Sequence, residues 1–205
     1  SNPPELGFPI KDLRKYRIEY ASGPWSIKFG DIYEVWGRGL VLAQLDDQGI
    51  DFDNSSRGYL INYQADRISV TQMSGETVNA QLGSDLRYPE FEFTHNIDAT
   101  NINFDAYPFS YGLSFLQSNE LHQLKPLGVM DTIDINHRLH GAYISWFGSN
   151  MDIFAEYVDK QSKERSFQTN FSAQEIETLT PLKKGSAFYF NSNFYVGNWS
   201  LFFEY

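Results

Sequence analysis

The feature that most constrains this chain is the alternation of apolar and polar residues at every second position. It runs through residues 16–20, 25–29, 59–63, 109–115, 142–146 and 151–157. Successive side chains of a β-strand point to opposite faces, so this period indicates strands with one apolar face. No convincing stretch repeats at the 3.6-residue period of a helix. The sequence therefore predicts a nearly all-β chain.

Five short turns separate these runs. Each has turn chemistry or is flanked by alternation on both sides, and they fall at Ser22-Gly23-Pro24, Ala65-Asp66, Ala106-Tyr107-Pro108, Gly148-Ser149-Asn150 and Gly197-Asn198. They are spaced by about 42 residues three times and then by about 48. The longer, polar connections between them are predicted at 43–57, 74–88, 118–135 and 159–185. The chain is thus predicted to form five hairpins, in which tight turns alternate with long loops.

Two architectures share a repeat of this length. A propeller blade would need four short strands and its own repeat signature, and the sequence has neither. In an outer-membrane barrel, short periplasmic turns alternate with long extracellular loops, and the strands run for about 9–11 residues. The predicted fold is therefore an all-β, antiparallel up-and-down transmembrane β-barrel, or a partial barrel of about ten strands. A soluble β-sandwich stays open as the alternative.

Aromatic residues gather at the heights of the tight turns. Their amphipathic rings suit a membrane interface, where they would form a girdle. In a soluble protein the same residues would be ordinary core aromatics. The predicted interface residues are Tyr20, Trp25, Tyr63, Tyr107, Phe109, Trp146 and Trp199.

Composition excludes several classes of function. A net charge of −10 argues against a nucleic-acid surface, because phosphate binding needs clustered Lys and Arg. The absence of Cys excludes disulfides and thiolate metal sites. No apolar window is long enough for a transmembrane helix. Charged residues still make up 20% of the chain, as expected if the polar phase of each strand faces a wet lumen.

The stretch WSIKFGDIYEVWGRGLVLAQLDDQGIDFDNSSRGYLINY, residues 25–63, resembles an outer-membrane β-barrel family common in Bacteroidetes, a domain of unknown function sometimes described as porin-like. The family pattern ends one strand with G-x-x-Y-x-x-[FW]-G-[KR]-G-L, follows it with an acidic loop and opens the next strand with G-x-x-x-x-Y. The matching residues are Gly30, Tyr33, Trp36, Gly37, Arg38, Gly39, Leu40, Asp51, Asp53, Gly58 and Tyr63.

The resemblance implies a non-enzymatic protein of the bacterial outer membrane. Its partners would be outer-membrane lipid and small solutes or glycans. Because such proteins are usually longer, residues 1–205 are expected to be a single β-barrel segment truncated at both ends, although a ten-stranded barrel ending at Tyr205 stays open.

The string WGRG is the most specific short motif. Glycines on both sides of Arg38 suggest a bulge or a close backbone approach. We expect Arg38 to face the lumen or to pair with Asp51 or Asp53 of the acidic loop. The alternative for Arg38 is a solvated side chain at a structural bulge. The alternatives for the acidic loop are a solvated loop with Asx turns, a calcium or sugar site, and a loop that folds inward to constrict the lumen.

No catalytic set is predicted. His137 and His140 are three residues apart, so on a strand they would face opposite ways, and no metal site or cofactor follows from them. Nucleophile elbows, phosphate loops and dinucleotide fingerprints are missing. The sequence predicts a porin-like, transport or structural barrel protein, with a soluble carbohydrate-binding β-sandwich as the alternative. In that alternative Trp36, Trp146 and Trp199 would be exposed binding residues. An oligomeric state does not follow from the sequence.

Overall fold

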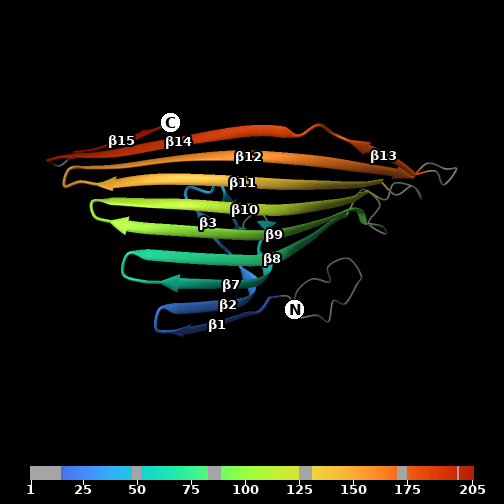
Figure 1. Cartoon of the computed structure of the whole chain (residues 1–205), viewed down its shortest axis with the longest axis horizontal. Coiled ribbons are helices and arrows are strands. Elements are labelled where there is room, and N and C mark those ends of the chain that lie inside the picture. Colours follow the sequence, from blue (N-terminus) through green and yellow to red (C-terminus); the bar gives the residue numbers. More distant parts are fainter. Residues whose placement is uncertain (1–14, 48–51, 83–88, 125–130, 170–174, 198) are drawn as a thin grey trace.

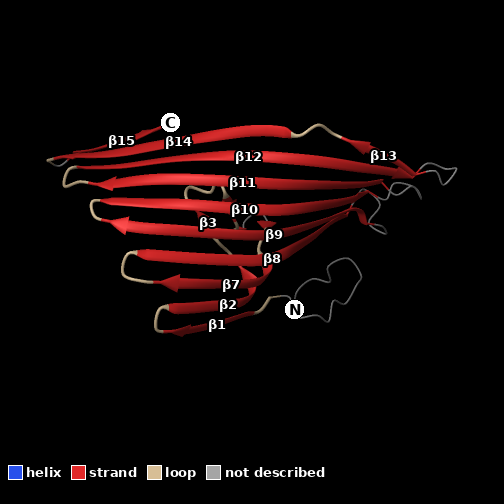
Figure 2. Ribbon diagram, in the orientation of Figure 1, coloured by secondary structure: helices blue, strands red, loops and turns tan. Residues whose placement is uncertain are grey.

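The computed structural model describes residues 15–47, 52–82, 89–124, 131–169, 175–197 and 199–205. Every regular element within these ranges is a β-strand (Figure 2). No helix among the described residues is long and apolar enough to span a membrane. The all-β prediction is confirmed.

One large antiparallel sheet contains eleven strands. They are β1 (Arg17–Ser22), β2 (Trp25–Ile32), β7 (Ser56–Gln64), β8 (Ile68–Leu82), β9 (Pro89–Ala106), β10 (Phe109–Leu124), β11 (Asp131–Phe147), β12 (Met151–Thr169), β13 (Glu175–Leu179), β14 (Lys183–Val196) and β15 (Trp199–Glu204). Their order in the sheet follows the chain, except that β13 pairs with β12 beside β14. This is the predicted up-and-down topology. Among the described residues no pairing joins β1 to β15, so the sheet is a partial barrel with two open edges.

Four two-residue strands form two small ladders outside the large sheet. They are β3 (Val35–Trp36) with β4 (Leu42–Ala43), and β5 (Asp46–Asp47) with β6 (Phe52–Asp53). All four belong to the connection between β2 and β7. This connection is the largest departure of the fold from a simple series of hairpins.

The tight turns of all five predicted hairpins lie along one edge of the sheet (Figure 1). Gly23, with φ +55°, forms part of the first, and Gly197, with φ +59°, forms part of the last. Residues with a Cβ atom adopt this left-handed conformation only at a cost, which explains glycine at both positions. The five predicted turn positions are confirmed.

The opposite ends of the strands extend further than the sequence predicts. Residues assigned to long loops at 74–88, 118–135 and 159–185 belong in large part to β8, β10, β11, β12 and β14. Those boundaries were set where the apolar alternation stops, but a hydrogen-bonded ladder does not need apolar side chains. The backbone pairing continues through polar residues, as between Glu120 and His95.

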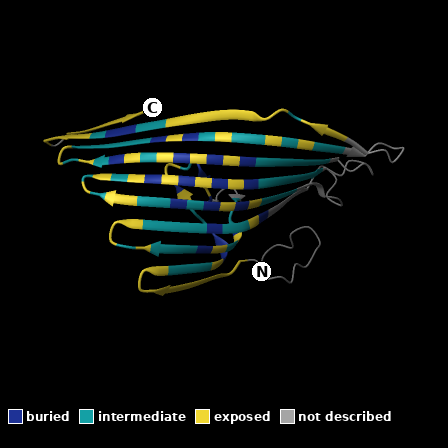
Figure 3. Ribbon diagram, in the orientation of Figure 1, coloured by how far each residue is buried: buried dark blue, intermediate teal, exposed yellow. Residues whose placement is uncertain are grey.

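The two faces of the sheet differ. We call the inner face the one that carries Leu60, Met73, Ala99, Leu116 and Leu139, and the outer face its opposite. All five side chains are buried and belong to the hydrophobic core cluster. Figure 3 shows buried and exposed positions alternating along the central strands. The core therefore lies on the inner face, beneath the connection between β2 and β7.

Candidate functional site

The described part of the connection between β2 and β7 folds onto the inner face of the sheet, and we call its residues 33–47 and 52–55 the inward segment. The sequence predicted a long loop at 43–57, with a loop that folds inward as one of the alternatives, and the described residues follow that alternative. Besides its two small ladders, the inward segment is held together by Asn54, whose Oδ1 accepts from Leu45 N–H and whose Nδ2 donates to the Ala43 carbonyl. The segment thus satisfies much of its backbone internally, as a buried connection must.

Apolar packing fixes the middle of the inward segment. Trp36, Val41 and Leu42 are buried and join the core cluster of the sheet. Val41 lies against Gly141 of β11 so closely that a Cβ atom there would overlap its methyl group. Burying a large apolar side chain contributes on the order of 1.5–3 kcal/mol, so three such residues hold the segment firmly to the sheet.

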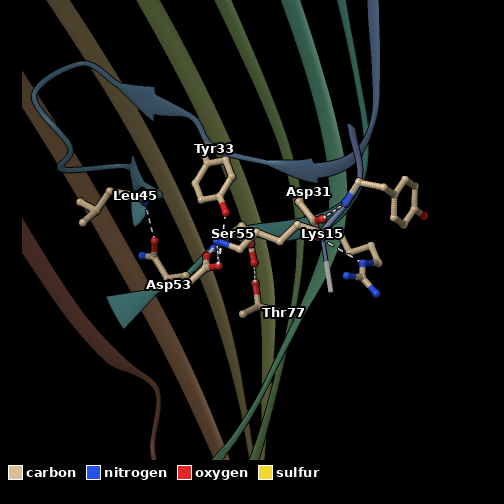
Figure 4. A network of polar contacts seen from close by, with 10 residues as sticks. Lys15, Asp31, Tyr33, Leu45, Asp53, Ser55 and Thr77 are labelled. Carbon is tan, nitrogen blue, oxygen red and sulfur yellow. Dashed lines mark hydrogen bonds and ion pairs between the residues drawn. The ribbon is translucent and has the colours of Figure 1, made fainter. Parts of the chain in front are cut away.

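Asp53 anchors the C-terminal end of the inward segment (Figure 4). Lys15 Nζ lies 2.8 Å from its carboxylate, Tyr33 OH donates to it over 3.2 Å, and Ser55 N–H donates over 2.9 Å. Burial works to raise the pKa of this carboxyl, but the hydrogen bonds from Lys15 and Ser55 outweigh it and leave the pKa below the ordinary value. Asp53 is therefore ionised at neutral pH.

A second set of hydrogen bonds joins the same end to the sheet. Thr77 of β8 donates to the Ser55 carbonyl over 2.6 Å (Figure 4). Ser56 Oγ accepts from Gln44 Nε2 and lies 3.2 Å from Thr77 Oγ1. Gln44, Ser56 and Thr77 are all buried, so these polar side chains bond to one another instead of to water, while Gln44 Oε1 has no hydrogen-bond partner among the described residues.

The tip of the inward segment reaches β12. Arg38 N–H donates to Glu156 Oε2 over 2.9 Å, across 118 positions of the sequence. The Arg38 guanidinium lies 5.0 Å from the centre of the Phe154 ring, within the range of a cation–π contact. Gly37 has φ +62°, which favours glycine, and its missing side chain leaves room for the Glu156 carboxylate.

The predicted pairing of Arg38 with the acidic loop is not formed at Asp53, the member of the predicted pair that the structure describes. Arg38 contacts Glu156 and Phe154, whereas the cation beside Asp53 is Lys15. Asp51 lies outside the described residues. The sequence showed that Arg38 and Asp53 are in unusual surroundings, but their partners come from segments that no local pattern connects.

The seven predicted interface aromatics lie at the edge with the tight turns. Register pairs Trp25 with Tyr63, with ring centroids 4.7 Å apart, and pairs Phe109 with Trp146. Tyr107 and Trp199 are the most exposed, and Tyr20 flanks the first turn. Their clustering at one edge is as predicted, and their contact with lipid stays a prediction. Trp36, in contrast, is buried, so its expected role as an exposed binding residue is wrong.

The outer face changes character along the strands. One row across the sheet, near the turns, is wholly apolar; it contains Tyr63, Val70, Ile102, Leu113, Ala142, Tyr157 and Phe188. Two rows further from the turns, the corresponding row is polar from β8 to β14, where it contains Ser74, Asp98, Gln117, Arg138, Gln161 and Lys184, and it stays apolar at Tyr59 of β7 and Phe29 of β2. We call the part between the turns and Phe115 the apolar band. Along β10 it runs from Phe109 to Phe115, about 20 Å at the usual rise of a strand.

A polar cavity of about 510 Å³ opens between the tip of the inward segment and the inner face. It is lined by Trp36 and Arg38 of the inward segment and by inner-face side chains of five strands. The side chains from the strands are Asn101, Asn103, Ser110, Tyr143, Ser145, Asp152, Phe154, Asn191 and Asn193. Tyr143 OH donates to Asn103 Oδ1 over 3.0 Å, and the Tyr143 and Phe154 rings stack 5.4 Å apart. The cavity can accept a small polar molecule.

A smaller pocket, of about 200 Å³, lies under residues 41–44 of the inward segment. Beside it, the Nε2 atoms of three histidines surround the carboxylate of Glu120: His137 at 3.3 Å, His122 at 3.4 Å and His95 at 3.8 Å. The hydrogen bond from His137, against the opposing effect of burial, lowers the pKa of Glu120 to about 2. Among the described residues, no group of three or more His, Asp or Glu side chains is placed to hold a metal ion.

Sequence reasoning missed the residues that complete both sites. The sequence patterns singled out neither Glu156 nor Lys15. His137 was compared only with His140, which is exposed on the outer face. The useful signal was the strand pairing, which places Ser118 opposite His137 and Glu120 opposite His95.

Comparisons with known proteins give a family and no activity. A family model described as a family of unknown function (DUF6029) matches residues 5–205. No curated protein matches the chain, and no solved structure matches it.

Proposed function

Since the chain belongs to a family of unknown function, DUF6029, which brings no activity with it, we propose its role from its two-faced sheet. The protein is a segment of a β-barrel in the outer membrane of a bacterium, with a porin-like, transport or structural role and no enzymatic activity. Residues 1–205 act as one unit, and the apolar band faces lipid.

The apolar band is the observation that carries this proposal. Leu201, with 60% of its surface exposed, and Phe188, with 54%, are outer-face residues within it. Monomeric soluble proteins rarely expose a contiguous apolar surface of more than a few hundred Å². Hydrocarbon removes the cost of this exposure, and the antiparallel ladder satisfies the backbone of the strands between the two open edges where no water is present.

The boundary of the apolar band also fits a bilayer. At the row of Thr100, Phe115, His140 and Asp159 the outer face becomes polar, and beyond it charged residues are frequent. Along β10 the band is about 20 Å long, and the strands of outer-membrane barrels cross the apolar layer at a tilt. The extended ends of the strands would then stand in water outside the membrane.

The inner face supports passage or binding of a polar solute. It is lined with Asn, Ser and Tyr near the turns, and the inward segment lies across it, where it would narrow a closed barrel. This is the constricting loop that the sequence left as one alternative. The competing soluble β-sandwich would need a second sheet over the outer face, and the described strands form only one large sheet.

Tryptophan fluorescence tests the proposal, because the four Trp residues divide between the faces. Trp25, Trp146 and Trp199 lie at the edge with the tight turns, and Trp36, in the inward segment, is buried in the core cluster of the inner face. In vesicles of brominated phosphatidylcholine, bromine atoms quench an indole that they contact. We expect strong quenching of the unaltered protein and little quenching of a variant that keeps only Trp36.

A variant that keeps only Trp199 is the matched control, and its emission should be quenched as strongly as that of the unaltered protein. If Trp199 and Trp36 were quenched equally, or if the protein stayed soluble without detergent and ignored the vesicles, the membrane proposal would be abandoned.

A further inference from the structure

The polar cavity between the inward segment and the inner face has the composition of a carbohydrate site. Four of its lining side chains are Asn, from β9 and β14, and two are Ser. Each Asn offers both a donor and an acceptor, which is what the hydroxyl groups of a sugar require. A volume of about 510 Å³ lies within the range of small-molecule sites and is large enough for a disaccharide.

Aromatic rings supply the other half of such a site. Trp36, Tyr143 and Phe154 line the same cavity, and the last two are stacked. The C–H faces of a sugar ring pack against aromatic faces, while its hydroxyl groups bond to polar side chains around the edge. Rings and amides that converge on one cavity therefore favour a polyhydroxylated ligand over a purely apolar one.

Charge argues for a neutral ligand. Arg38 and Asp152 are the charged side chains among the described residues that line the cavity, and they cancel. The Glu156 carboxylate accepts from the Arg38 backbone N–H and does not line the cavity. An anionic ligand would meet the Asp152 carboxylate, and a cationic ligand would meet the Arg38 guanidinium.

The inward segment sets the geometry of the cavity. Its tip is fixed by the Arg38 N–H to Glu156 hydrogen bond and by the buried Trp36, so Arg38 and Trp36 form one wall against the sheet. On the opposite wall, Asn103 Nδ2 donates to Ser69 over 3.2 Å while its Oδ1 accepts from Tyr143. These contacts hold the side chains in place before a ligand arrives, which reduces the entropy lost on binding.

We propose that this cavity binds a neutral mono- or disaccharide, with the Asn side chains of β9 and β14 bonding its hydroxyl groups beside Tyr143 and Phe154, which line the same cavity. The inference deepens the proposed function, on which it rests, by naming the solute class that the inner face takes.

Binding can be read from Trp36 in the variant that keeps it as the sole Trp, purified as the full chain in detergent. Maltose, cellobiose and lactose are the neutral probes, and digalacturonate is the charged one. We expect a saturable change of Trp36 emission with at least one neutral disaccharide and none with digalacturonate. Asn193→Leu should weaken that binding at least tenfold, because it removes two hydrogen-bonding groups from the cavity.

Asn62→Leu is the matched control, since Asn62 lies on the inner face at β7 and does not line the cavity. It should leave binding within twofold, and the unfolding temperature of each variant shows that it is folded. No saturable response to any neutral disaccharide, equal effects of Asn193→Leu and Asn62→Leu, or tighter binding of digalacturonate would each overturn the inference.

The same samples separate this inference from the membrane proposal. Quenching by brominated lipid without sugar binding would contradict the proposed carbohydrate site and support the proposed membrane barrel. Sugar binding by a protein that does not bind the vesicles would support the carbohydrate site and would favour a soluble carbohydrate-binding protein over a membrane barrel.

Discussion

Glu156 occupies the space that a Cβ atom on Gly37 would need, and the two residues lie on segments far apart in the sequence. The same carboxylate accepts the Arg38 N–H over 2.9 Å, and only 2% of Glu156 is exposed. A motif between β2 and β7 is thus completed by a residue of β12. This contact locks the tip of the inward segment onto the sheet.

Replacing Gly37 by Ala should loosen that lock. The new Cβ would push the Glu156 carboxylate away from the Arg38 amide, and overpacking of this kind costs about 1–3 kcal/mol. Gly197→Ala is the matched control, because Gly197 has a similar positive φ but open space around its Cβ position. Proteolysis within residues 33–45 should accelerate in Gly37→Ala alone. Equal behaviour of the two variants would mean that backbone conformation, and not Glu156, governs the tip.

Replacing Asp53 by Asn should release the other end of the inward segment. The substitution keeps the shape of the side chain but removes the charge that faces Lys15, and hydrogen bonds to charged groups contribute about 1.5–3 kcal/mol. Hydrogen exchange at the Ser55 amide, which donates to Asp53, should become at least tenfold faster. Asp98→Asn, at an exposed outer-face position, should leave that amide as protected as in the unaltered protein; unchanged protection in Asp53→Asn would contradict the anchoring role.

Arginine scanning of β10 should locate the edge of the apolar band. Leu113 and Gln117 both face outward, four residues apart, but Leu113 lies in the apolar row and Gln117 in the row that is polar from β8 to β14. In a bilayer Leu113→Arg should cost about 2–4 kcal/mol, and Gln117→Arg close to nothing. Urea unfolding in vesicles measures both. Similar costs at the two positions would show that no lipid boundary lies between them.

Acid should destabilise the far ends of β9, β10 and β11, beyond the apolar band. The folded pKa of Glu120 is about 2, below its ordinary 4.5, so its stabilising contribution is complete above pH 4.5 and is lost as the pH falls towards 2. Burial lowers the pKa of His95, so below its ordinary pKa of 6.5 the unfolded chain binds a proton that the folded one resists. Both effects lower stability on acidification.

The unfolding midpoint, followed from pH 7 to pH 3, checks this expectation. Glu120→Gln should remove the part of the slope that lies below pH 4.5, on the order of 1–3 kcal/mol. Glu76→Gln, at an exposed position of β8, should keep the full slope. If the unfolding midpoint of Glu120→Gln depended on pH in this range as that of the unaltered protein does, the histidines would not be stabilising the ionised Glu120 carboxylate in the folded protein.

Much of the fold was predictable because its rules are local. The period of two fixes which residues share a face, so Leu113 and Ala142 were assigned to the same side before their pairing was known. Turn chemistry at Gly23-Pro24 and Tyr107-Pro108 fixed the hairpins. The far strand ends were not predictable in the same way, since pairing there depends on the neighbouring ladder and not on apolar side chains.

The sequence by itself determined the all-β class, the five hairpins and the division into two faces, because alternation and turn residues act over a few neighbouring positions. Only the tertiary structure decided where the inward segment lies and what Arg38 and Asp53 contact. Those contacts join β12 and Lys15 to a segment far away in the chain, and their energy depends on curvature and close packing that arise once the sheet has formed. No spacing in the sequence encodes the meeting of Glu156 with the Arg38 backbone N–H, which is why the sequence predicted a pair of Arg38 with the acidic loop instead.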